Sequence, residues 1–225
     1  MNVYLKVWGD MACFTRPEMN VERVSYPVMT PSAARGVLEA ILFKPQFRWN
    51  IHRIAVKRPI SFLSFRRNEV KKTLSLLKPE PIYIEEERTQ RNTLALRDVE
   101  YIIEASISLT PQAIPNPANN LVKYEQMFLR RAEKGQCFNQ PYLGCREFSC
   151  HFELAKLEDM QVQGRPNRDI NWGLMVYDTF NLDTAYVQQP VVTASKVTVF
   201  NASLVNGIVN IPRWSEVRKQ LTQPA

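Results

Sequence analysis

The stretch Val99–Leu109 constrains the fold of this chain most, because apolar and polar side chains alternate along almost all of it. Its apolar positions are Tyr101, Ile103, Ala105, Ile107 and Leu109, and polar side chains stand at Glu100, Glu104, Ser106 and Ser108. Successive side chains of a strand point to opposite faces of a sheet. The pattern therefore predicts a strand with one face in a core.

Residues 2–8 show the same alternation at the start of the chain. Three apolar side chains would face a core: Val3, Leu5 and Val7. The opposite face would carry two aromatic rings and a cation: Tyr4, Lys6 and Trp8. Such a face is typical of a nucleic-acid-binding sheet. The alternative is a strand buried on both faces or covered by a later segment.

Two segments have the periodicity of helices. The first opens at Thr30, a suitable N-cap, with Pro31 at the first helical position, and Lys44-Pro45 should stop it. The second begins at Leu121, and Gly135 is placed to end it in the left-handed conformation that glycine tolerates.

The second helix predicts an apolar flank and a basic flank. At 100° per residue one flank would hold Leu121, Tyr124, Phe128 and Ala132. A different flank would hold Lys123, Arg130 and Lys134, with Arg131 between the two groups. We therefore expect one flank to face a core and a line of cations to face a partner.

The remaining patterns complete an α+β fold. Strands are expected over Trp49–Pro59 and near Tyr142–Leu154. Residues 61–92 are predicted to form an inserted hairpin or a long loop. Prolines 111, 115 and 117 indicate a connector before the second helix. The order strand, helix, strand, strand, helix, strand is that of the ferredoxin-like (RRM-like, βαββαβ) fold. We expect this domain over residues 1–154 and a small antiparallel β-sheet domain over residues 155–225. Its short strands would lie near Trp172–Phe180, Val191–Phe200 and Ile208–Ile211.

Composition narrows the class of partner. The 29 basic and 22 acidic residues give a net charge of +7, which favours nucleic acid, RNA or duplex DNA, over an acidic membrane surface. Charge runs within 61–92 are either a solvated face or a basic loop that grips phosphates. The start of the chain lacks a signal-peptide profile, and the four cysteines form no C-x-x-C pair, so we expect a cytoplasmic protein with reduced thiols.

Few residues are available for metal or nucleotide chemistry. His52 and His151 are the two histidines, no metal-ligand grouping or P-loop is present, and we expect no cofactor.

Cleavage of RNA by its own 2′-hydroxyl needs only a base, a cation and an acid. Lys123 and Tyr124 are such a pair by residue type; the alternative is that Tyr124 belongs to the apolar flank and Lys123 is simply exposed.

Six blocks of residues also carry a resemblance to a known family. They are 14–18 (FTRPE), 23–27 (RVSYP), 30–36 (TPSAARG), 39–41 (EAI), 134–138 (KGQCF) and 142–148 (YLGCREF). In this order they resemble the Cas-five family of subtype I-C (Dvulg) CRISPR systems, in the RAMP superfamily. The resemblance implies a metal-independent endoribonuclease that cuts precursor CRISPR RNA at the base of the repeat hairpin. It also implies that the protein stays on the 5′ handle, beside the backbone and large subunits of an interference complex.

The resemblance also points to site residues. Characterised members use a tyrosine before the W-K-P or F-K-P that ends the first helix, where this chain has Leu42. They use a lysine–histidine pair before a tyrosine at the second helix, where this chain has Val122-Lys123-Tyr124. Either Lys123 and Tyr124 carry the proton transfers with help from Tyr26 or His52, or this member is a non-catalytic subunit that caps the RNA handle. Phosphates would be held by Arg23, Lys44, Arg88, Arg91, Arg130, Arg131 and Lys134.

Overall fold

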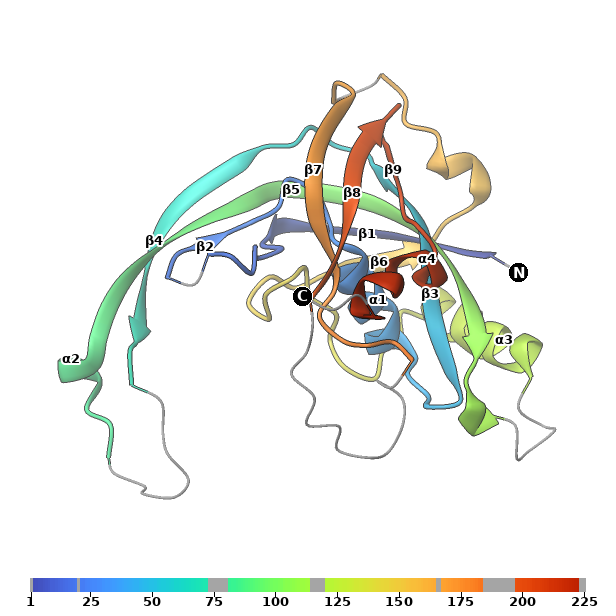
Figure 1. The fold of residues 1–225 in the computed structure, drawn as a ribbon, viewed down its shortest axis with the longest axis horizontal. Coiled ribbons are helices and arrows are strands. Elements are labelled where there is room, and N and C mark those ends of the chain that lie inside the picture. Colours follow the sequence, from blue (N-terminus) through green and yellow to red (C-terminus); the bar gives the residue numbers. More distant parts are fainter. Residues whose placement is uncertain are drawn as a thin grey trace.

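The computed structural model describes residues 2–19, 21–72, 81–113, 120–164, 167–183 and 197–222. The strands form one nine-stranded sheet, and Figure 1 shows it as a curved layer with helices gathered on its concave side. Among the described residues no helix is long and apolar enough to cross a membrane.

The predicted ferredoxin-like arrangement is confirmed. Its four strands lie in the order β6-β1-β5-β3, and each is antiparallel to its neighbours. In chain order this is the arrangement 4-1-3-2 of the βαββαβ fold, with one helix crossing over after the first strand and one after the third. The bounds are β1 Asn2–Ala12, α1 Pro31–Ile41, β3 Phe47–Val56, β5 Arg88–Leu109, α3 Leu121–Glu133 and β6 His151–Leu154.

Local capping sets the helix ends as expected. The Thr30 hydroxyl accepts a hydrogen bond from the Ala33 backbone N–H at 3.2 Å, with Pro31 at the first helical position. Asn120 caps α3 in the same way through the backbone N–H of Lys123 at 2.9 Å. After α3, Gly135 has a φ of 63°, the left-handed conformation that a residue with a Cβ adopts only with strain.

The core lies between the helices and the concave face of the sheet. Along β1 the apolar side chains Leu5 and Val7 are fully buried, as the alternation predicts. Trp49 of β3 packs edge-on against Phe128 of α3, with ring centroids 4.7 Å apart. Of the predicted apolar flank, Tyr124, Phe128 and Ala132 are buried and hold α3 against the sheet, whereas Leu121 is exposed.

Residues 61–92 include the predicted hairpin. β4 (Phe62–Val70) pairs antiparallel with the first part of β5, α2 (Ile84–Glu87) precedes β5, and β2 (Arg23–Val24) joins β5 in parallel. Figure 1 shows this hairpin, which we call the arm, projecting at the end of the molecule opposite α3.

The C-terminal strands continue the same sheet. Their order is β9 (Ile208–Asn210), β8 (Thr198–Val205) and β7 (Ile170–Asp178), and β9 pairs antiparallel with β3. Two short helices follow, α4 (Trp214–Val217) and α5 (Lys219–Thr222). The domain boundary after residue 154 stays a prediction, and the core cluster includes residues from both sides of it.

The prediction of a strand near Tyr142–Leu154 is correct only for its last four residues. Residues 142–150 form a tight loop in which the Leu143 backbone N–H donates to the Phe148 carbonyl oxygen at 2.8 Å. Gly144 makes this turn with a φ of 85°. The start of the predicted strand Val191–Phe200 and prolines 115 and 117 lie outside the described residues.

The convex face of the sheet is partly covered by a later segment, one of the two alternatives for β1. A short helical turn, η2 (Leu157–Met160), places Met160 against Ile102 and Ala55. The Tyr4 hydroxyl donates to Glu104 at 3.1 Å, and Lys6 pairs with Glu153 at 3.1 Å. The aromatic and cationic side chains of this face are therefore engaged within the protein.

Candidate nucleic-acid interface

Lys123 and Tyr124 stand together at the start of α3, but in different environments. Lys123 is exposed, and its ammonium lies 5.7 Å from the centroid of the Tyr124 ring. The Tyr124 ring is buried against Phe47, with centroids 4.9 Å apart. Tyr124 thus belongs to the apolar flank of α3, and Lys123 presents a cation directly beside it.

The environment of this pair decides which proton transfers it suits. Burial raises the pKa of Tyr124 above its usual range, so its phenol stays protonated at neutral pH. A protonated phenol can donate a hydrogen bond or a proton but cannot act as a base. The exposed ammonium of Lys123 can neutralise charge on a phosphate.

Tyr26 lies away from this pair. It is buried at the N-terminal side of α1, where the Arg16 guanidinium lies 5.0 Å from its ring centroid and burial raises its pKa. Phe47, which contacts Tyr124, follows the C-terminal end of α1. Eleven helical residues span about 16 Å. The structure therefore does not bring Tyr26 to Lys123.

His52 lies on the face of the sheet opposite the helices. Its Nε2 is 2.7 Å from the Ser106 hydroxyl, and burial lowers its pKa. On β5, Ser106 alternates with the core residues Ala105 and Ile107, so this pair faces away from α3. Neither predicted helper thus reaches the start of α3.

The cations of α3 divide into two roles. Lys123, Arg130 and Lys134 are exposed on one flank, and we call these three residues the α3 ridge. Arg131 instead turns toward α1, where its guanidinium donates to the carbonyl oxygen of Ile41 at 3.0 Å. It thereby satisfies one of the carbonyl groups that a helix leaves unpaired at its C-terminal end. Lys44 is exposed in the loop that follows α1.

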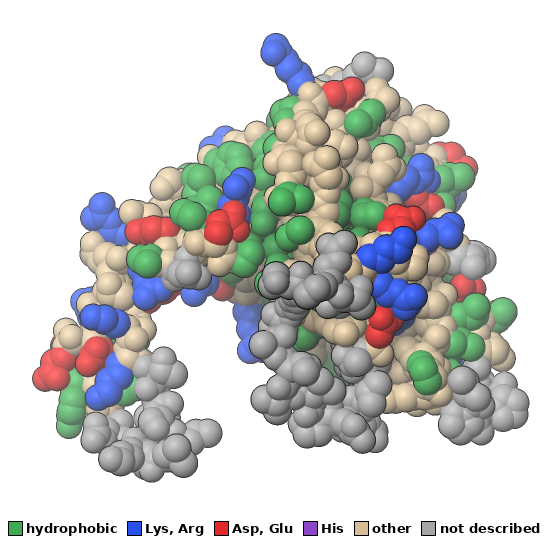
Figure 2. Space-filling view, viewed as in Figure 1, with side chains coloured by type: hydrophobic (Ala, Val, Ile, Leu, Met, Phe, Trp, Pro, Cys, Tyr) green, Lys and Arg blue, Asp and Glu red, His purple; other side chains and the backbone are tan. Residues whose placement is uncertain are grey.

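The cations at the arm are surrounded by carboxylates. Arg23 pairs with Glu69 at 3.1 Å and with Glu147 at 3.5 Å, and Arg91 lies 3.6 Å from Glu69. Arg88 is exposed. Figure 2 shows basic and acidic side chains side by side along the arm. The predicted phosphate-binding residues therefore do not form one group. Arg88 and Arg91 lie on the arm, and Arg23 lies between the arm and Cys145. Arg130 and Lys134 lie with Lys123 on the α3 ridge.

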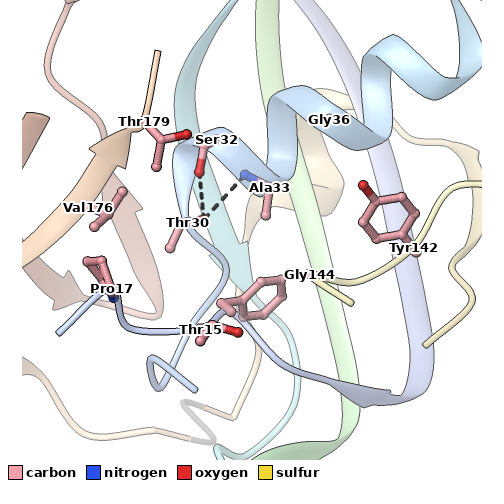
Figure 3. Close-up of a pocket in the computed structure, with 11 residues that line it drawn as sticks. Thr15, Pro17, Thr30, Ser32, Ala33, Gly36, Tyr142, Gly144, Val176 and Thr179 are labelled. Atoms are coloured by element: carbon pink, nitrogen blue, oxygen red, sulfur yellow. Dashed lines mark hydrogen bonds between the residues drawn. The ribbon is translucent and has the colours of Figure 1, made fainter. Parts of the chain in front are cut away.

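A cavity of about 360 Å³ opens at the N-terminal end of α1 (Figure 3). It lies among Thr30, Ser32, Gly36, Tyr142 and Thr179. Gly36 and Tyr142 also line a second groove, which runs toward the other end of α1. The sequence assigned none of these residues to a site, although Thr30, Ser32 and Gly36 lie in block 30–36 and Tyr142 lies in block 142–148, both of which carry the family resemblance.

Two free thiols lie next to the first cavity. A hydrogen bond with Cys13 lowers the pKa of the Cys145 thiol, and the Arg23 guanidinium, 3.8 Å from its sulfur, acts in the same direction. The same hydrogen bond and burial raise the pKa of Cys13. A Cβ built on Gly144 would lie 2.0 Å from the Cys13 carbonyl oxygen, so this loop packs directly on the end of β1.

Within the described ranges no three or more His, Cys, Asp or Glu side chains come together in a way that could hold a metal ion.

Comparison with known proteins places this geometry in context. Residues 3–210 match the family described as "CRISPR-associated protein (Cas_Cas5)". The chain is 42% identical over 226 residues to a protein of Mannheimia succiniciproducens named "CRISPR pre-crRNA endoribonuclease Cas5d", covering 93% of this chain and 94% of that one. It is 49% identical over 187 residues to a protein of the same name from Thermus thermophilus, covering 83% and 74%.

A solved structure shares the fold. It is titled "Crystal Structure of CRISPR-associated Protein", and it matches with a TM-score of 0.69 at 21% identity over 96% of this chain and 94% of that one.

Proposed function

This chain belongs to the Cas5 family of CRISPR-associated proteins, subtype I-C, and we propose that it is an endoribonuclease that cuts precursor CRISPR RNA at the repeat hairpin. The observation that carries the proposal for this chain is the position of Lys123. It is an exposed cation at the start of the α3 ridge, beside a buried phenol, at the place where the family resemblance expects catalytic residues.

The reaction that fits these groups is attack by the RNA's own 2′-hydroxyl. A hydroxide from the solvent takes the 2′ proton and becomes water, the 2′ oxygen bonds to the adjacent phosphorus, and the bond from phosphorus to the 5′ oxygen breaks. The leaving oxygen takes a proton, which leaves a 2′,3′-cyclic phosphate and a 5′-hydroxyl. Lys123 would stabilise the charge that builds on the phosphate, and Tyr124 would donate to it or to the leaving oxygen. None of these steps requires a metal ion.

The test is cleavage of a repeat-hairpin RNA by a Lys123→Ala variant. Loss of the cation should slow cleavage about 100-fold or more, the effect of removing one stabilising group from a transition state. Binding should change less than about threefold, because Arg130 and Lys134 remain on the α3 ridge. Lys123→Arg, which keeps the charge, is the matched control. Cleavage at the normal rate by Lys123→Ala would remove Lys123 from the mechanism.

Two substrate experiments test the chemistry itself. A 2′-deoxy substitution at the scissile nucleotide should stop cleavage, because the attacking oxygen is gone. Cleavage should survive EDTA. A deoxy substrate that is still cut, or cleavage that requires added metal, would contradict 2′-hydroxyl attack through Lys123.

A second function is favoured by one observation. Leu42 stands where the family resemblance expects a catalytic tyrosine, and its side chain is fully buried. A non-catalytic subunit that caps the 5′ handle beside the backbone and large subunits would need no such tyrosine. Incubation of the purified protein with its own repeat RNA separates the nuclease from the capping subunit, because only the nuclease cuts the RNA.

A third function, binding to duplex DNA through the same cations, predicts an affinity that falls steeply with salt and does not depend on sequence.

A further inference from the structure

Cys13 and Cys145 are in contact although 132 positions separate them in the sequence. The Cys145 sulfur lies 3.7 Å from the Cys13 carbonyl oxygen, and the two thiols share a hydrogen bond. The backbones are joined as well, because the Cys13 N–H donates to the Leu143 carbonyl oxygen at 3.0 Å. We call Cys13 and Cys145 the thiol pair. To form a disulfide, the two sulfurs have only to approach from contact to about 2.05 Å.

The four cysteines differ in their access to solvent. Cys13 is fully buried, whereas Cys145 is partly exposed in the loop 142–150. Cys150 is buried, and its thiol donates to the His151 carbonyl oxygen at 3.3 Å. Cys137 is partly exposed after the end of α3. A reagent in solution therefore reaches Cys145 and Cys137, and of these two Cys145 has a second thiol in contact.

Two guanidinium groups lie beside the thiol pair. Arg23 Nη1 is 3.8 Å from the Cys145 sulfur. Arg67 lies near Cys13, and its Nε is buried without a hydrogen-bond acceptor among the described residues. Glu147 carries the opposing charge, but its carboxylate pairs with both Arg23, at 3.5 Å, and Arg67. A neighbouring arginine stabilises the thiolate, which is the form of cysteine that reacts. Cys145 is therefore placed to react first.

The thiol pair lies where the loop 142–150 packs on β1. A Cβ built on Gly144 would lie 2.0 Å from the Cys13 carbonyl oxygen, so the loop lies directly on the end of the strand. Residues from both segments line the cavity at the N-terminal end of α1 (Figure 3): Phe14, Thr15, Tyr142 and Gly144. A covalent bond between Cys13 and Cys145 would thus fix two walls of that cavity to each other.

We propose that the thiol pair is an oxidation site, at which a peroxide oxidises Cys145 and Cys13 then closes a disulfide that fixes the loop 142–150 to the end of β1. This inference goes beyond the proposed RNA chemistry at Lys123 and does not depend on it. Where glutathione keeps thiols reduced, a disulfide of this kind forms only transiently. The thiol pair therefore acts as a reversible clamp on the cavity.

The reaction takes place in two steps. The Cys145 thiolate attacks one oxygen of hydrogen peroxide: an S–O bond forms, the O–O bond breaks, and the leaving hydroxide takes up the thiol proton to become water. The product is a sulfenic acid on Cys145. The Cys13 sulfur then attacks the Cys145 sulfur, the S–S bond forms, and the S–O bond breaks. The oxygen leaves as water with the Cys13 proton. The two thiols thus lose two electrons and two protons, and the peroxide is reduced to two waters.

The first experiment treats the reduced protein with a few equivalents of hydrogen peroxide. Two of the four thiols should be lost, and peptide mapping should find a disulfide between Cys13 and Cys145. The melting temperature should rise by about 4–16 °C, the effect of a cross-link that closes a long loop in a chain of this size. Dithiothreitol should reverse both changes. Cys137→Ser removes the other partly exposed thiol, and as the matched control it should form the same disulfide.

Three results of this experiment would overturn the proposal. The first is a Cys145 that stays reduced while Cys137 is oxidised. The second is a disulfide that joins Cys145 to another molecule rather than to Cys13. The third is a fully cross-linked protein that melts no higher than the reduced one, because the loop would then not be fixed.

The second experiment tests the order of the two steps. In Cys13→Ser the sulfenic acid on Cys145 has no second thiol to meet, so it should persist and react with dimedone, which traps sulfenic acids. In the wild type the disulfide should remove most of this signal. In Cys145→Ser the buried Cys13 should remain a thiol at the same peroxide concentration. Equal dimedone labelling of Cys13→Ser and wild type, or oxidation of Cys13 in Cys145→Ser, would refute the proposed order.

The third experiment tests the role assigned to Arg23. Arg23→Gln should slow the oxidation of Cys145 by about threefold or more, because less of its thiol would be ionised. Arg23→Lys keeps the positive charge and should retain more of the rate. An equal rate of oxidation in Arg23→Gln and wild type would contradict the reason for placing the first step at Cys145.

Discussion

Arg35 should be one of the most important side chains for stability, because it joins α1 to β7. Its guanidinium donates to both carboxylate oxygens of Asp178 at 2.9–3.1 Å, and the exposed fractions of the two side chains are 11% and 2%. It also pairs with Glu39 one turn along α1 at 2.9 Å. Arg35→Ala would leave the buried carboxylate of Asp178, the last residue of β7, without its guanidinium partner.

The size of the loss follows from the burial of Asp178. Removing one partner of a buried ion pair costs about 3–5 kcal/mol, because the other charge stays in a poorly solvated place. Asp178 keeps a hydrogen bond from the Phe180 backbone N–H at 3.0 Å, so we expect the lower end, about 3 kcal/mol. With an m-value of about 3 kcal/mol/M, the midpoint of urea unfolding should fall by about 1 M.

Two further variants make this measurement specific. Glu39→Gln removes a more exposed partner of Arg35 and should cost about 0.5 kcal/mol or less. Arg35→Ala combined with Asp178→Asn removes the unpaired charge and should be more stable than Arg35→Ala alone. A loss below about 1 kcal/mol for Arg35→Ala, or no recovery in the double variant, would refute a buried charge pair as the link between α1 and β7.

Three other outcomes are expected from local features. Thr30→Ala should lower the free energy of unfolding by about 1 kcal/mol through loss of the N-cap, and Thr30→Ser should retain it in the same urea titration. Gly144→Ala should cost about 2–4 kcal/mol in thermal unfolding, because its Cβ would overlap the Cys13 carbonyl at a positive φ; a stable variant would show that the loop moves freely. Burial lowers the pKa of His52 below its unfolded value of about 6.5, so its neutral form favours the fold fully above that pH, and stability falls as pH drops below it. His52→Gln should flatten this part of the pH profile of the melting temperature, and an unchanged slope would exclude His52 as its source.

The parts of the fold encoded by local patterns could be predicted from the sequence. The Thr30 cap and the left-handed Gly135 are set by neighbouring residues, and α1 begins and α3 ends where those signals stand. α1 ends at Ile41, before the predicted stop at Lys44-Pro45. The alternation of Val99–Leu109 identified the central strand, and the order of elements gave the ferredoxin-like arrangement. The order of elements could not predict that β9 pairs with β3, because only tertiary contacts decide which strands become neighbours.

The candidate site was less predictable, for the same reason. Helical geometry placed Lys123, Arg130 and Lys134 on one flank correctly. Helical geometry could not show that Arg131 donates to a carbonyl oxygen at the C-terminal end of α1, or that Tyr26 lies near the N-terminal end of α1. Both positions depend on where α1 packs. The alternation of Phe148, Cys150, Phe152 and Leu154 with polar residues predicted a strand near Tyr142–Leu154. Its first part is instead a loop, whose turn at Gly144 packs against the end of β1.

The unbroken course of β5 has a mechanical consequence. A single strand of 22 residues, with a contour of roughly 73 Å, runs from the tip of the arm to the connector before α3. The number of residue pairs between β4 and β5 therefore sets how far the arm projects from the rest of the molecule. Removing two facing residue pairs would shorten the arm by about 7 Å and leave every remaining side chain on the same face of the sheet. Removing one pair would move the side chains of the outer part of the arm to the opposite face.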